Sequence, residues 1–177
     1  MSVIDPIPRI ETRRLALRAP CMSDATRLAL LANDFDIARM TTRMPYPYRQ
    51  EDAEAFLGRM ETLDHAREAA FVIEHEDEGA IGVIALHPSD SFAPEIGYWL
   101  GRAYWGRGFA TEAAAAVLAW TKSRWGRRAL VSGHFADNPA SGRVLEKAGF
   151  LYTGEVLPRH SEARGEPART RMMVWLA

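Results

Sequence analysis

A strand, a glycine-containing loop and a long helix follow one another in the middle of the chain, and this unit limits the folds that are open to it. Glu95–Leu100 has the composition of a strand, Gly106-Arg107-Gly108 that of a tight loop, and Phe109 to about Arg124 that of a helix rich in small residues. A strand at Ala129–Gly133 then completes a βαβ crossover, in which the two strands lie parallel. Open sheets bind ligands outside the carboxyl ends of such strands, which predicts a site at residues 99 to 112.

The segments around this crossover predict an α+β domain whose sheet is otherwise mostly antiparallel. Alternating β-rich runs mark strands, and apolar residues at helical spacing mark helices. No repeat or biased linker divides the chain, so we expect residues 1–177 to form a single domain. The other expected strands are Leu15–Arg18, Ala69–Glu74, Ala80–Leu86, Phe150–Val156 and Arg169–Leu176, the last two joined by a loop containing Pro158, Gly165 and Pro167. The other expected helices are one capped by Ser23-Asp24, one from Gln50 to about His65, and one opened by Asn138-Pro139 and closed by Gly149.

The charge balance and the cysteine count exclude several classes of protein. With 22 basic and 23 acidic residues the formal charge is −1, so no nucleic acid or anionic membrane is expected as a partner. Cys21 is the only cysteine, which excludes a disulfide within the chain and any CxxC motif, and fits a cytoplasmic location. The first thirty residues lack the pattern of a secretion signal, and the longest apolar run, Ala113–Trp120, is far shorter than the roughly 20 residues that span a bilayer. No group of His, Cys and carboxylate residues has ligand spacing, so no metal is expected.

Residues 105 to 111 have the features of an anion-binding loop. They lie between a strand and the first turn of a helix, where backbone N–H groups have no partner within the helix. Two glycines allow a pyrophosphate to approach the backbone, the helix dipole favours its negative charge, and Arg102 and Arg107 add positive charge. A tight strand-to-helix turn without a ligand would explain the same glycines. The chain has no GxxxxGK[ST] motif, and Thr111 takes the third glycine position of the dinucleotide fingerprint, so neither of these nucleotide loops is expected.

Two pairs of segments resemble the signatures of the GNAT N-acetyltransferases. The sequences EIGYWL at 95–100 and YWGRGFATEA at 104–113 look like the acetyl-CoA motif of that family. NPAS at 138–141, followed by VLEKAGF at 144–150, is similar to its second signature, at the expected distance.

Two further segments resemble one branch of that family. The opening ETRRLALR at 11–18 and PYPY at 45–48 look like the branch that acetylates ribosomal-protein N-termini, the RimJ/RimL-like enzymes. The loop begins with Trp105, as is common in that branch, where the wider family has glutamine or arginine. The branch also contains enzymes for antibiotics, polyamines and free amino acids, so the resemblance leaves the acceptor open.

The resemblance implies a GNAT-like α/β/α sandwich with a mostly antiparallel sheet of six to seven strands. It also implies that the sheet splays between its fourth and fifth strands, Glu95–Leu100 and Ala129–Gly133, and that the pantetheine arm of acetyl-CoA lies in the resulting cleft. Backbone groups near Trp99 and Leu100 would then bind that arm and polarise the thioester carbonyl. The expected cofactor-binding residues are Trp99, Leu100, Arg102, Gly106, Arg107, Gly108, Phe109, Ala110, Thr111, Asn138 and Ser141.

Acetyl transfer to an amine requires a neutral amine, a polarised thioester and a proton for the departing thiolate. An α-amine has an ordinary pKa of about 7.7 to 8.0, so a carboxylate that removes its proton, directly or through water, promotes the reaction. Glu95 is the first candidate for this catalytic base, and a carboxylate that faces solvent or pairs with Arg102 is the alternative. By the resemblance, Ser141 would hydrogen-bond the sulfur and relay a proton, and Asn138 would bind the cofactor or help to order the site. Asn138 is equally suited to cap its helix.

Histidines and the lone cysteine offer weaker alternatives. His134, just past a strand, is a second candidate for the base, although a loop histidine is more often only solvated. The same holds for His87 and His160. Cys21 is better explained as a small packed side chain than as a nucleophile, which disfavours a covalent acetyl-cysteine route.

The resemblance therefore implies an enzyme that moves acetyl from acetyl-CoA to a primary amine by direct attack. The acceptor is a protein N-terminus or a small amine, and its selection is expected from the helices between 23 and 65 and the loop Pro158–Ala168. An acyl-CoA-binding sensor or regulatory module without turnover is the alternative. Glu95 and Ser141 favour the enzyme, because such a module needs neither. A monomer or a homodimer is expected, as is common in the family.

Overall fold

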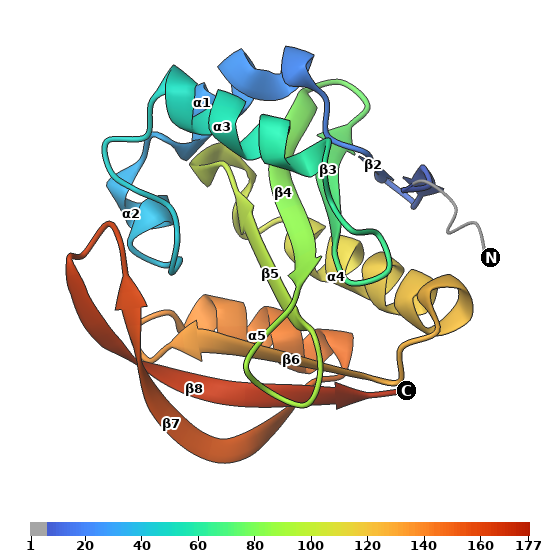
Figure 1. The fold of residues 1–177 in the computed structure, drawn as a ribbon, viewed down its shortest axis with the longest axis vertical. Coiled ribbons are helices and arrows are strands. Elements are labelled where there is room, and N and C mark those ends of the chain that lie inside the picture. Colours follow the sequence, from blue (N-terminus) through green and yellow to red (C-terminus); the bar gives the residue numbers. More distant parts are fainter. Residues whose placement is uncertain (1–6) are drawn as a thin grey trace.

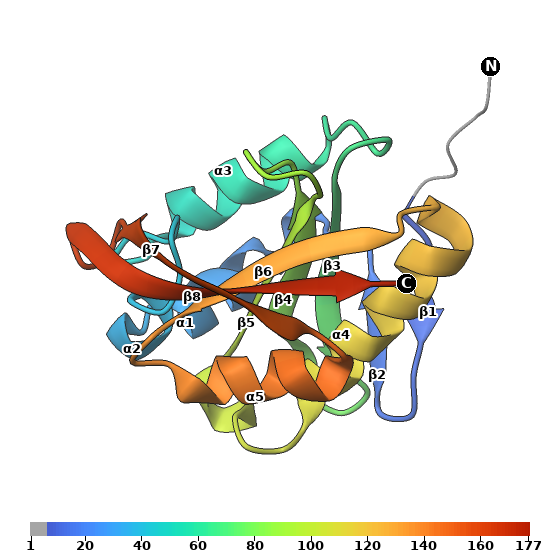
Figure 2. The ribbon, with the colours of Figure 1, turned by 90° about the horizontal axis from the view of Figure 1, so that it is seen from below.

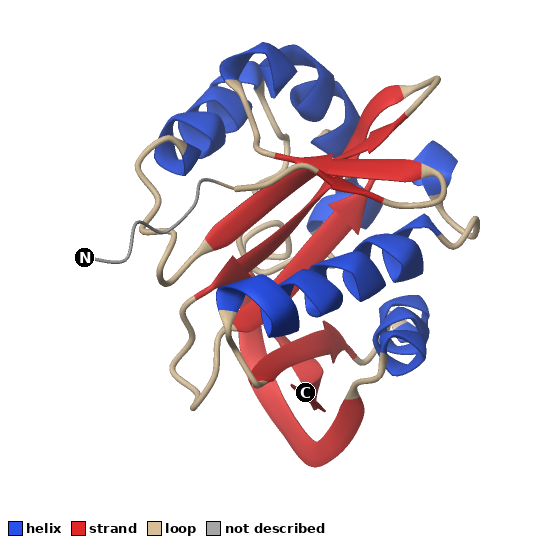
Figure 3. Cartoon of the chain, turned by 90° about the vertical axis from the view of Figure 1, so that its right-hand side faces the viewer, coloured by secondary structure: helices blue, strands red, loops and turns tan. Residues whose placement is uncertain are grey.

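The computed structural model describes residues 7–177, whose strands form one twisted sheet with helices on both faces (Figure 1, Figure 3). The strand order is β1-β2-β3-β4-β5-β6-β8-β7, and all neighbours are antiparallel except β5 and β6. The strands are β1 (Ile10–Glu11), β2 (Leu15–Arg18), β3 (Ala69–His75), β4 (Gly79–His87), β5 (Glu95–Leu100), β6 (Ala129–Phe135), β7 (Leu151–Ser161) and β8 (Glu166–Leu176). The α-helices are α1 (Ala25–Ala32), α2 (Phe35–Ala38), α3 (Gln50–Met60), α4 (Phe109–Trp120) and α5 (Pro139–Ala148). Short 3₁₀ turns lie at Met22–Asp24 and Arg102–Tyr104, and a wider helical turn at Thr121–Trp125 follows α4.

Alternation along the central strands divides the apolar side chains between two cores. On β3, Phe71 and Ile73 pack with α4 and α5, whereas Val72 packs with α1 and α3. All three are fully buried. Figure 2 shows α3 and α5 on opposite sides of the strands. Burial of each such side chain stabilises the fold by about 1.5–3 kcal/mol, so both helical layers are held to the sheet by the period-2 pattern of its strands.

The parallel neighbours β5 and β6 pair only near their starts. Their single register pair is Glu95 with Val131, supported by a hydrogen bond from the Val131 N–H to the Pro94 carbonyl (2.9 Å). The Ser132 hydroxyl donates to the Ile96 carbonyl (2.9 Å), and beyond this point the two strands separate (Figure 1). The splay predicted between these two strands is therefore confirmed. They are the fifth and sixth strands, because β1 precedes the first strand that the sequence predicts.

The last two strands are longer than the sequence predicts. The expected loop with Pro158 and Pro167 is wrong, because Pro158 pairs with Arg169 and Pro167 with His160 inside the β7–β8 ladder. Proline lacks an N–H and is tolerated in a strand only where no neighbour needs that donor. β7 is an edge strand, and β8 pairs with β6 only from residue 170 onward, so both prolines have a free side.

Short elements and helix ends account for the other differences. β1 has two residues and α2 has four, too few to produce a periodic pattern, and neither is predicted. α3 ends at Met60 rather than near His65. Within residues 7–177, no helix combines the length and the apolar composition that crossing a bilayer requires.

A glycine substitution tests the packing of β4 against β5. A Cβ on Gly82 would overlap the backbone oxygen of Trp99 and lie 2.9 Å from Cδ2 of Leu100, so Gly82→Ala must displace β5. We expect a loss of about 1–3 kcal/mol in the free energy of unfolding, measured by urea denaturation. The matched control is Gly58→Ala in α3, where a Cβ meets nothing within 4 Å and the fold should be as stable or slightly more stable. Equal stability of the two variants would contradict the register of β4 and β5.

Candidate active site

The separation of β5 from β6 opens a cleft of about 580 Å³, a volume in the range of small-molecule and cofactor sites. Its walls are β5, the end of β6, the first turn of α4, one side of α5 and the segment around α2. Within the described part of the chain, no group of three or more His, Cys, Asp or Glu residues is placed to hold a metal ion. Of the predicted site residues, all except Arg102 and Arg107 line the cleft, namely Glu95, Trp99, Leu100, Gly106, Gly108, Phe109, Ala110, Thr111, Asn138 and Ser141.

The loop before α4 carries a run of unpaired amides. None of the backbone N–H groups of residues 106 to 111 donates a hydrogen bond within residues 7–177, and the first bond of the helix is donated by Glu112 to the Gly108 carbonyl (3.0 Å). Gly106 and Gly108 have φ values of +71° and +79°, which residues with a side chain rarely adopt. Amides gathered in this way at the positive end of a helix form an anion-binding site.

Contacts from the turn between β1 and β2 hold this loop in place. The Glu112 carboxylate accepts hydrogen bonds from the Thr12 hydroxyl (2.7 Å) and from the backbone N–H (2.8 Å) and Nε (2.7 Å) of Arg14. Burial alone would raise the pKa of Glu112, but the bonds from Thr12 and Arg14 outweigh it and hold the pKa below its usual value. Arg14 also donates to the Arg107 carbonyl (2.9 Å). The ETRR segment thus fixes the conformation of the glycine loop from a hundred residues away.

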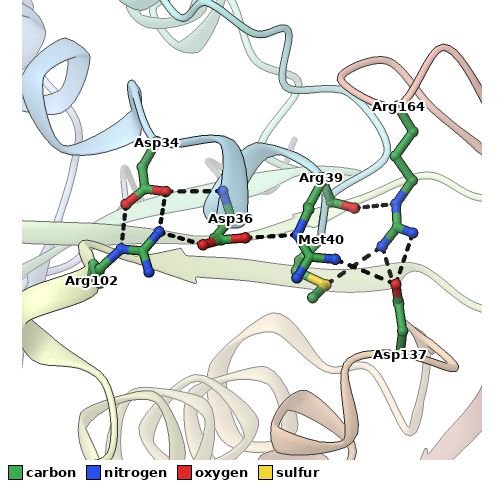
Figure 4. A network of polar contacts seen from close by, with 7 residues as sticks. All are labelled: Asp34, Asp36, Arg39, Met40, Arg102, Asp137 and Arg164. Carbon is green, nitrogen blue, oxygen red and sulfur yellow. Dashed lines mark hydrogen bonds and ion pairs between the residues drawn. The ribbon is translucent and has the colours of Figure 1, made fainter.

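The two cations predicted to assist this loop lie outside the cleft lining. Arg107 places its guanidinium carbon 4.8 Å from the centre of the Phe109 ring. Arg102 binds Asp34 through two hydrogen bonds of 2.6 Å and Asp36 through a third of 2.6 Å (Figure 4). The hydrogen bonds from Arg102 are the main reason that the pKa values of both aspartates lie below their usual range.

The ion pairs of Arg102 continue from one wall of the cleft to the other (Figure 4). Asp36 also binds Arg39 (2.9 Å), and Arg39 lies 3.4 Å from Asp137. Arg164 binds both oxygens of Asp137 at 2.9 Å and donates to the Arg39 carbonyl (2.6 Å). Since Arg102 follows β5 and Asp137 follows β6, this network joins the two separated strands through the α2 segment.

The face of β5 that looks toward α1 and α3 carries Glu95 and Gly97. The Glu95 carboxylate is 13% exposed and binds the Arg159 guanidinium through both oxygens, at 2.5 and 3.0 Å. The sequence offers, as the alternative to a catalytic base, a carboxylate that faces solvent or pairs with Arg102. In the structure Glu95 does neither, because it pairs with Arg159. His87 is the register partner of Glu95 on β4, so its side chain lies on the same face and also lines the cleft.

On the opposite face of β5, the hydroxyl group of Tyr98 meets that of Ser141 from α5. The Tyr98 hydroxyl lies 2.9 Å from Oγ of Ser141 and donates to the Ser141 carbonyl (3.2 Å). Burial raises the pKa of Tyr98 to about 12, so the phenol stays protonated at neutral pH. The side chain of Asn138 accepts a hydrogen bond from the Ser141 N–H (3.3 Å) and caps α5, as one of its two predicted roles requires.

Backbone alternation identifies the peptide group that faces the opening. The carbonyls of Pro94 and Ile96 both point to β6, so those of Tyr98 and Leu100 follow in the same direction. The Leu100 carbonyl accepts from Nε1 of Trp105 (2.8 Å). The N–H and carbonyl of Tyr98 therefore border the cleft beside the positions that the sequence predicts.

His134, the second candidate for the base, is buried with both ring nitrogens occupied. Nδ1 lies 2.9 Å from the Phe135 carbonyl and Nε2 lies 3.0 Å from the Tyr152 hydroxyl. A Cβ on Gly142 would approach Nε2 of His134 to 2.7 Å, so the ring packs directly on α5. These contacts give His134 a packing role under α5.

Several charged or titratable residues of the cleft are absent from the predicted catalytic and cofactor-binding residues, among them Arg143, Lys147, His87 and Arg159. Arg143 and Lys147 line it from α5, and their basic i,i+4 spacing after the NPAS segment is a signal that would have found them. Arg159 meets Glu95 only through the sheet, and no local pattern marks it. His87, one of the weaker histidine candidates of the sequence, is brought beside Glu95 by the strand register.

Comparison with known proteins decides the family. A family model described as an acetyltransferase (GNAT) domain matches residues 14–151. The chain belongs to the GNAT acetyltransferase family. The uncharacterized N-acetyltransferase YoaA of Bacillus subtilis (strain 168) is 32% identical to it over 174 residues, which is 93% of this chain and 94% of that protein.

Solved structures show the same GNAT fold. RimL, a ribosomal L7/L12 alpha-N-protein acetyltransferase in complex with coenzyme A, superposes with a TM-score of 0.82 at 21% identity, over 96% of this chain and 98% of that one. The microcin C7 self-immunity acetyltransferase MccE, in complex with acetyl-CoA and AMP, has a TM-score of 0.81 at 20% identity and covers 94% of each chain. GNAT neighbours of this chain thus bind acetyl-CoA or CoA, and their acceptors differ.

The ion-pair network around Arg102 makes the stability of the fold decrease at acid pH. Because Asp34 and Asp36 have lowered pKa values in the folded chain, their contribution is present above the ordinary aspartate pKa of about 4 and is lost as pH falls through the lower folded values. We expect Arg102→Gln to lower the Tm by about 2 °C at pH 7 in low salt, and the difference to shrink as pH falls below the ordinary aspartate pKa of about 4. Arg124→Gln removes an exposed arginine that forms no ion pair within residues 7–177 and serves as the control. A difference that stays constant from pH 7 to pH 3 would contradict the network.

Proposed function

We propose that this chain is an N-acetyltransferase that moves the acetyl group of acetyl-CoA to a primary amine by direct attack. The observation that carries the proposal is the opening between β5 and β6, which connects two chemically different faces of the sheet. An imidazole and a carboxylate lie on the face toward α1 and α3, and two hydroxyl groups lie on the face toward α4 and α5. An amine that enters from the first face and a thiol that leaves toward the second would meet within the gap.

The residues of the cleft fit the parts of acetyl-CoA. The free amides of residues 106 to 111 suit the pyrophosphate. The pantetheine arm, an amide-containing chain, matches the open backbone edge of β5 at Tyr98, next to the predicted Trp99 and Leu100. Arg143 and Lys147 supply further positive charge for the phosphates from α5. Acetyl-CoA supplies the activated acetyl group and a thiolate leaving group.

Ser141 is the proposed source of the proton for the departing thiolate. The Tyr98 phenol keeps its own proton and lies 2.9 Å from Ser141 Oγ, so the pair can pass a proton toward the sulfur. Asn138 holds the first turn of α5, and with it Ser141, at the edge of the cleft. Glu95 is the carboxylate that we propose acts on the acceptor amine. It forms an ion pair with Arg159 and lies where the ammonium group of the acceptor would arrive.

A charge placed in the first turn of α4 tests the pyrophosphate site. Ala110→Glu places a carboxylate in the first turn of α4, where the helix dipole favours an acidic residue, but this carboxylate would repel the phosphates. We expect acetyl-CoA affinity, measured by isothermal titration, to fall at least about tenfold, the result of an unfavourable 1.4 kcal/mol. Ala115→Glu, on an exposed position of the same helix, should bind within about twofold of wild type. Equal affinity of the two variants would place the phosphates elsewhere.

Release of CoA thiol tests the reaction itself. The wild-type chain is assayed with acetyl-CoA and N-terminal peptides, free amino acids, polyamines or aminoglycosides, each against a reaction without acceptor. We expect acceptor-dependent release, and Ser141→Ala should lower kcat by about 10² to 10⁴ while acetyl-CoA affinity changes little. Ser91→Ala, in the exposed β4–β5 loop, is the control. Tight acetyl-CoA binding with no acceptor-dependent release would favour a sensor module over an enzyme.

A further inference from the structure

His87 is the last residue of β4 and lies at the acceptor face of the cleft. It is the register partner of Glu95, and it lines the cleft together with Glu95 and Gly97. Its Nε2 lies 3.9 Å from the position that a Cβ on Gly97 would take, so the glycine leaves open space in front of this nitrogen. A small group bound against β5 can therefore approach the imidazole.

The hydrogen bond of the ring defines its tautomer. Nδ1 lies 3.2 Å from the carbonyl oxygen of Pro88, and a carbonyl can only accept, so Nδ1 carries the proton in this contact. The neutral ring then has a lone pair on Nε2, and no side chain or backbone group within residues 7–177 donates to it. His87 is thus held with its basic nitrogen toward the cleft.

The surroundings of His87 keep the imidazole neutral. Burial is the main cause that lowers its pKa from the ordinary value, and the charges of Arg43 and Arg159 act in the same direction. The Pro88 carbonyl and the Glu95 carboxylate oppose this shift without overcoming it. At neutral pH the ring is therefore ready to accept a proton.

The two other candidates for the base, Glu95 and His134, are occupied. Both oxygens of Glu95 bind Arg159, and both nitrogens of His134 are hydrogen-bonded beneath α5. We propose that Nε2 of His87 is the general base that takes a proton from the acceptor ammonium, and that Glu95 with Arg159 positions the acceptor. This inference rests on the proposed acetyltransferase function and assigns a catalytic residue within it.

The proton balance of the step is complete with groups already described. His87 takes one proton from the ammonium, and the amine nitrogen then forms a bond to the thioester carbonyl carbon as the carbon–sulfur bond breaks. The nitrogen loses its second proton as the amide forms, and the thiolate gains one proton through Ser141, so this second loss is balanced by the new S–H bond. His87 returns its proton to solvent, so each turnover releases one proton overall.

His87→Gln tests the assignment through the pH dependence of kcat. Wild-type kcat, at saturating acetyl-CoA and acceptor, should fall as pH drops through a pKa below the ordinary histidine value of about 6.5. His87→Gln should lower kcat by about 10² to 10⁴, abolish this acidic limb and leave acetyl-CoA affinity within about threefold. The matched control is His75→Gln, which removes a histidine at the end of β3 that does not line the cleft, and it should keep both kcat and the limb.

A second measurement does not depend on turnover or on the variant. In the wild-type chain with ¹⁵N-labelled histidine, long-range ¹H–¹⁵N spectra at pH 8 should show His87 with a proton on Nδ1 and none on Nε2. A proton on Nε2 would overturn the proposal, as would a folded His87→Gln variant with wild-type kcat and acidic limb. If wild type binds acetyl-CoA but no acceptor releases CoA, the proposed function itself fails, which is a different outcome from a working enzyme that does not need His87.

Discussion

The incomplete pairing of β5 with β6 is the constraint on which the rest of the structure depends. Two neighbouring parallel strands normally hydrogen-bond along their length, and leaving their edges apart costs stability unless other groups satisfy them. Here Ser132 and Trp105 take the carbonyls of Ile96 and Leu100, so little of the β5 edge beyond Glu95 stays unpaired. What remains open is the stretch around Tyr98, at the centre of the cleft.

The same opening needs supports that keep it from collapsing or widening. The ion pairs from Arg102 through α2 to Asp137 tie the two sides together, and Glu112 with Arg14 fixes the glycine loop at one end. Most of these contacts join residues far apart in the chain. The cleft is thus a product of tertiary contacts imposed on a regular sheet, and alternation along β5 then gives its two faces different chemistry.

Local sequence signals predicted the elements that carry the site. The bounds of β5 and the cap and end of α5 at Asn138 and Gly149 follow from composition and capping rules, and they agree with the structure. The splay came from the resemblance of the 95–113 segment to the GNAT family, because no periodicity encodes the failure of two strands to pair. The prediction of a loop at Pro158 was wrong because a strand tolerates proline when it lies at the edge of a sheet. That β7 is an edge strand is a property of the whole sheet and not of the local sequence.

The contacts of the candidate site that the sequence does not predict also depend on the whole fold. The pairing of Glu95 with Arg159 and the position of His87 beside it depend on the strand register, and the Tyr98–Ser141 contact depends on how α5 docks. None of these partners is near the other in sequence. The sequence therefore identified the glycine loop and the residues of the motifs, while the groups that complete the chemistry became visible only with the fold.

A crystal structure of the chain with bound CoA tests the central claim most directly, because it locates the pantetheine arm relative to β5 and β6. The account predicts that the arm lies in the gap between the two strands, with the pyrophosphate on the amides of residues 106 to 111 and the sulfur between Ser141 on one face and His87 on the other. A CoA molecule bound outside this gap, or a gap closed by pairing of β5 with β6, would contradict it.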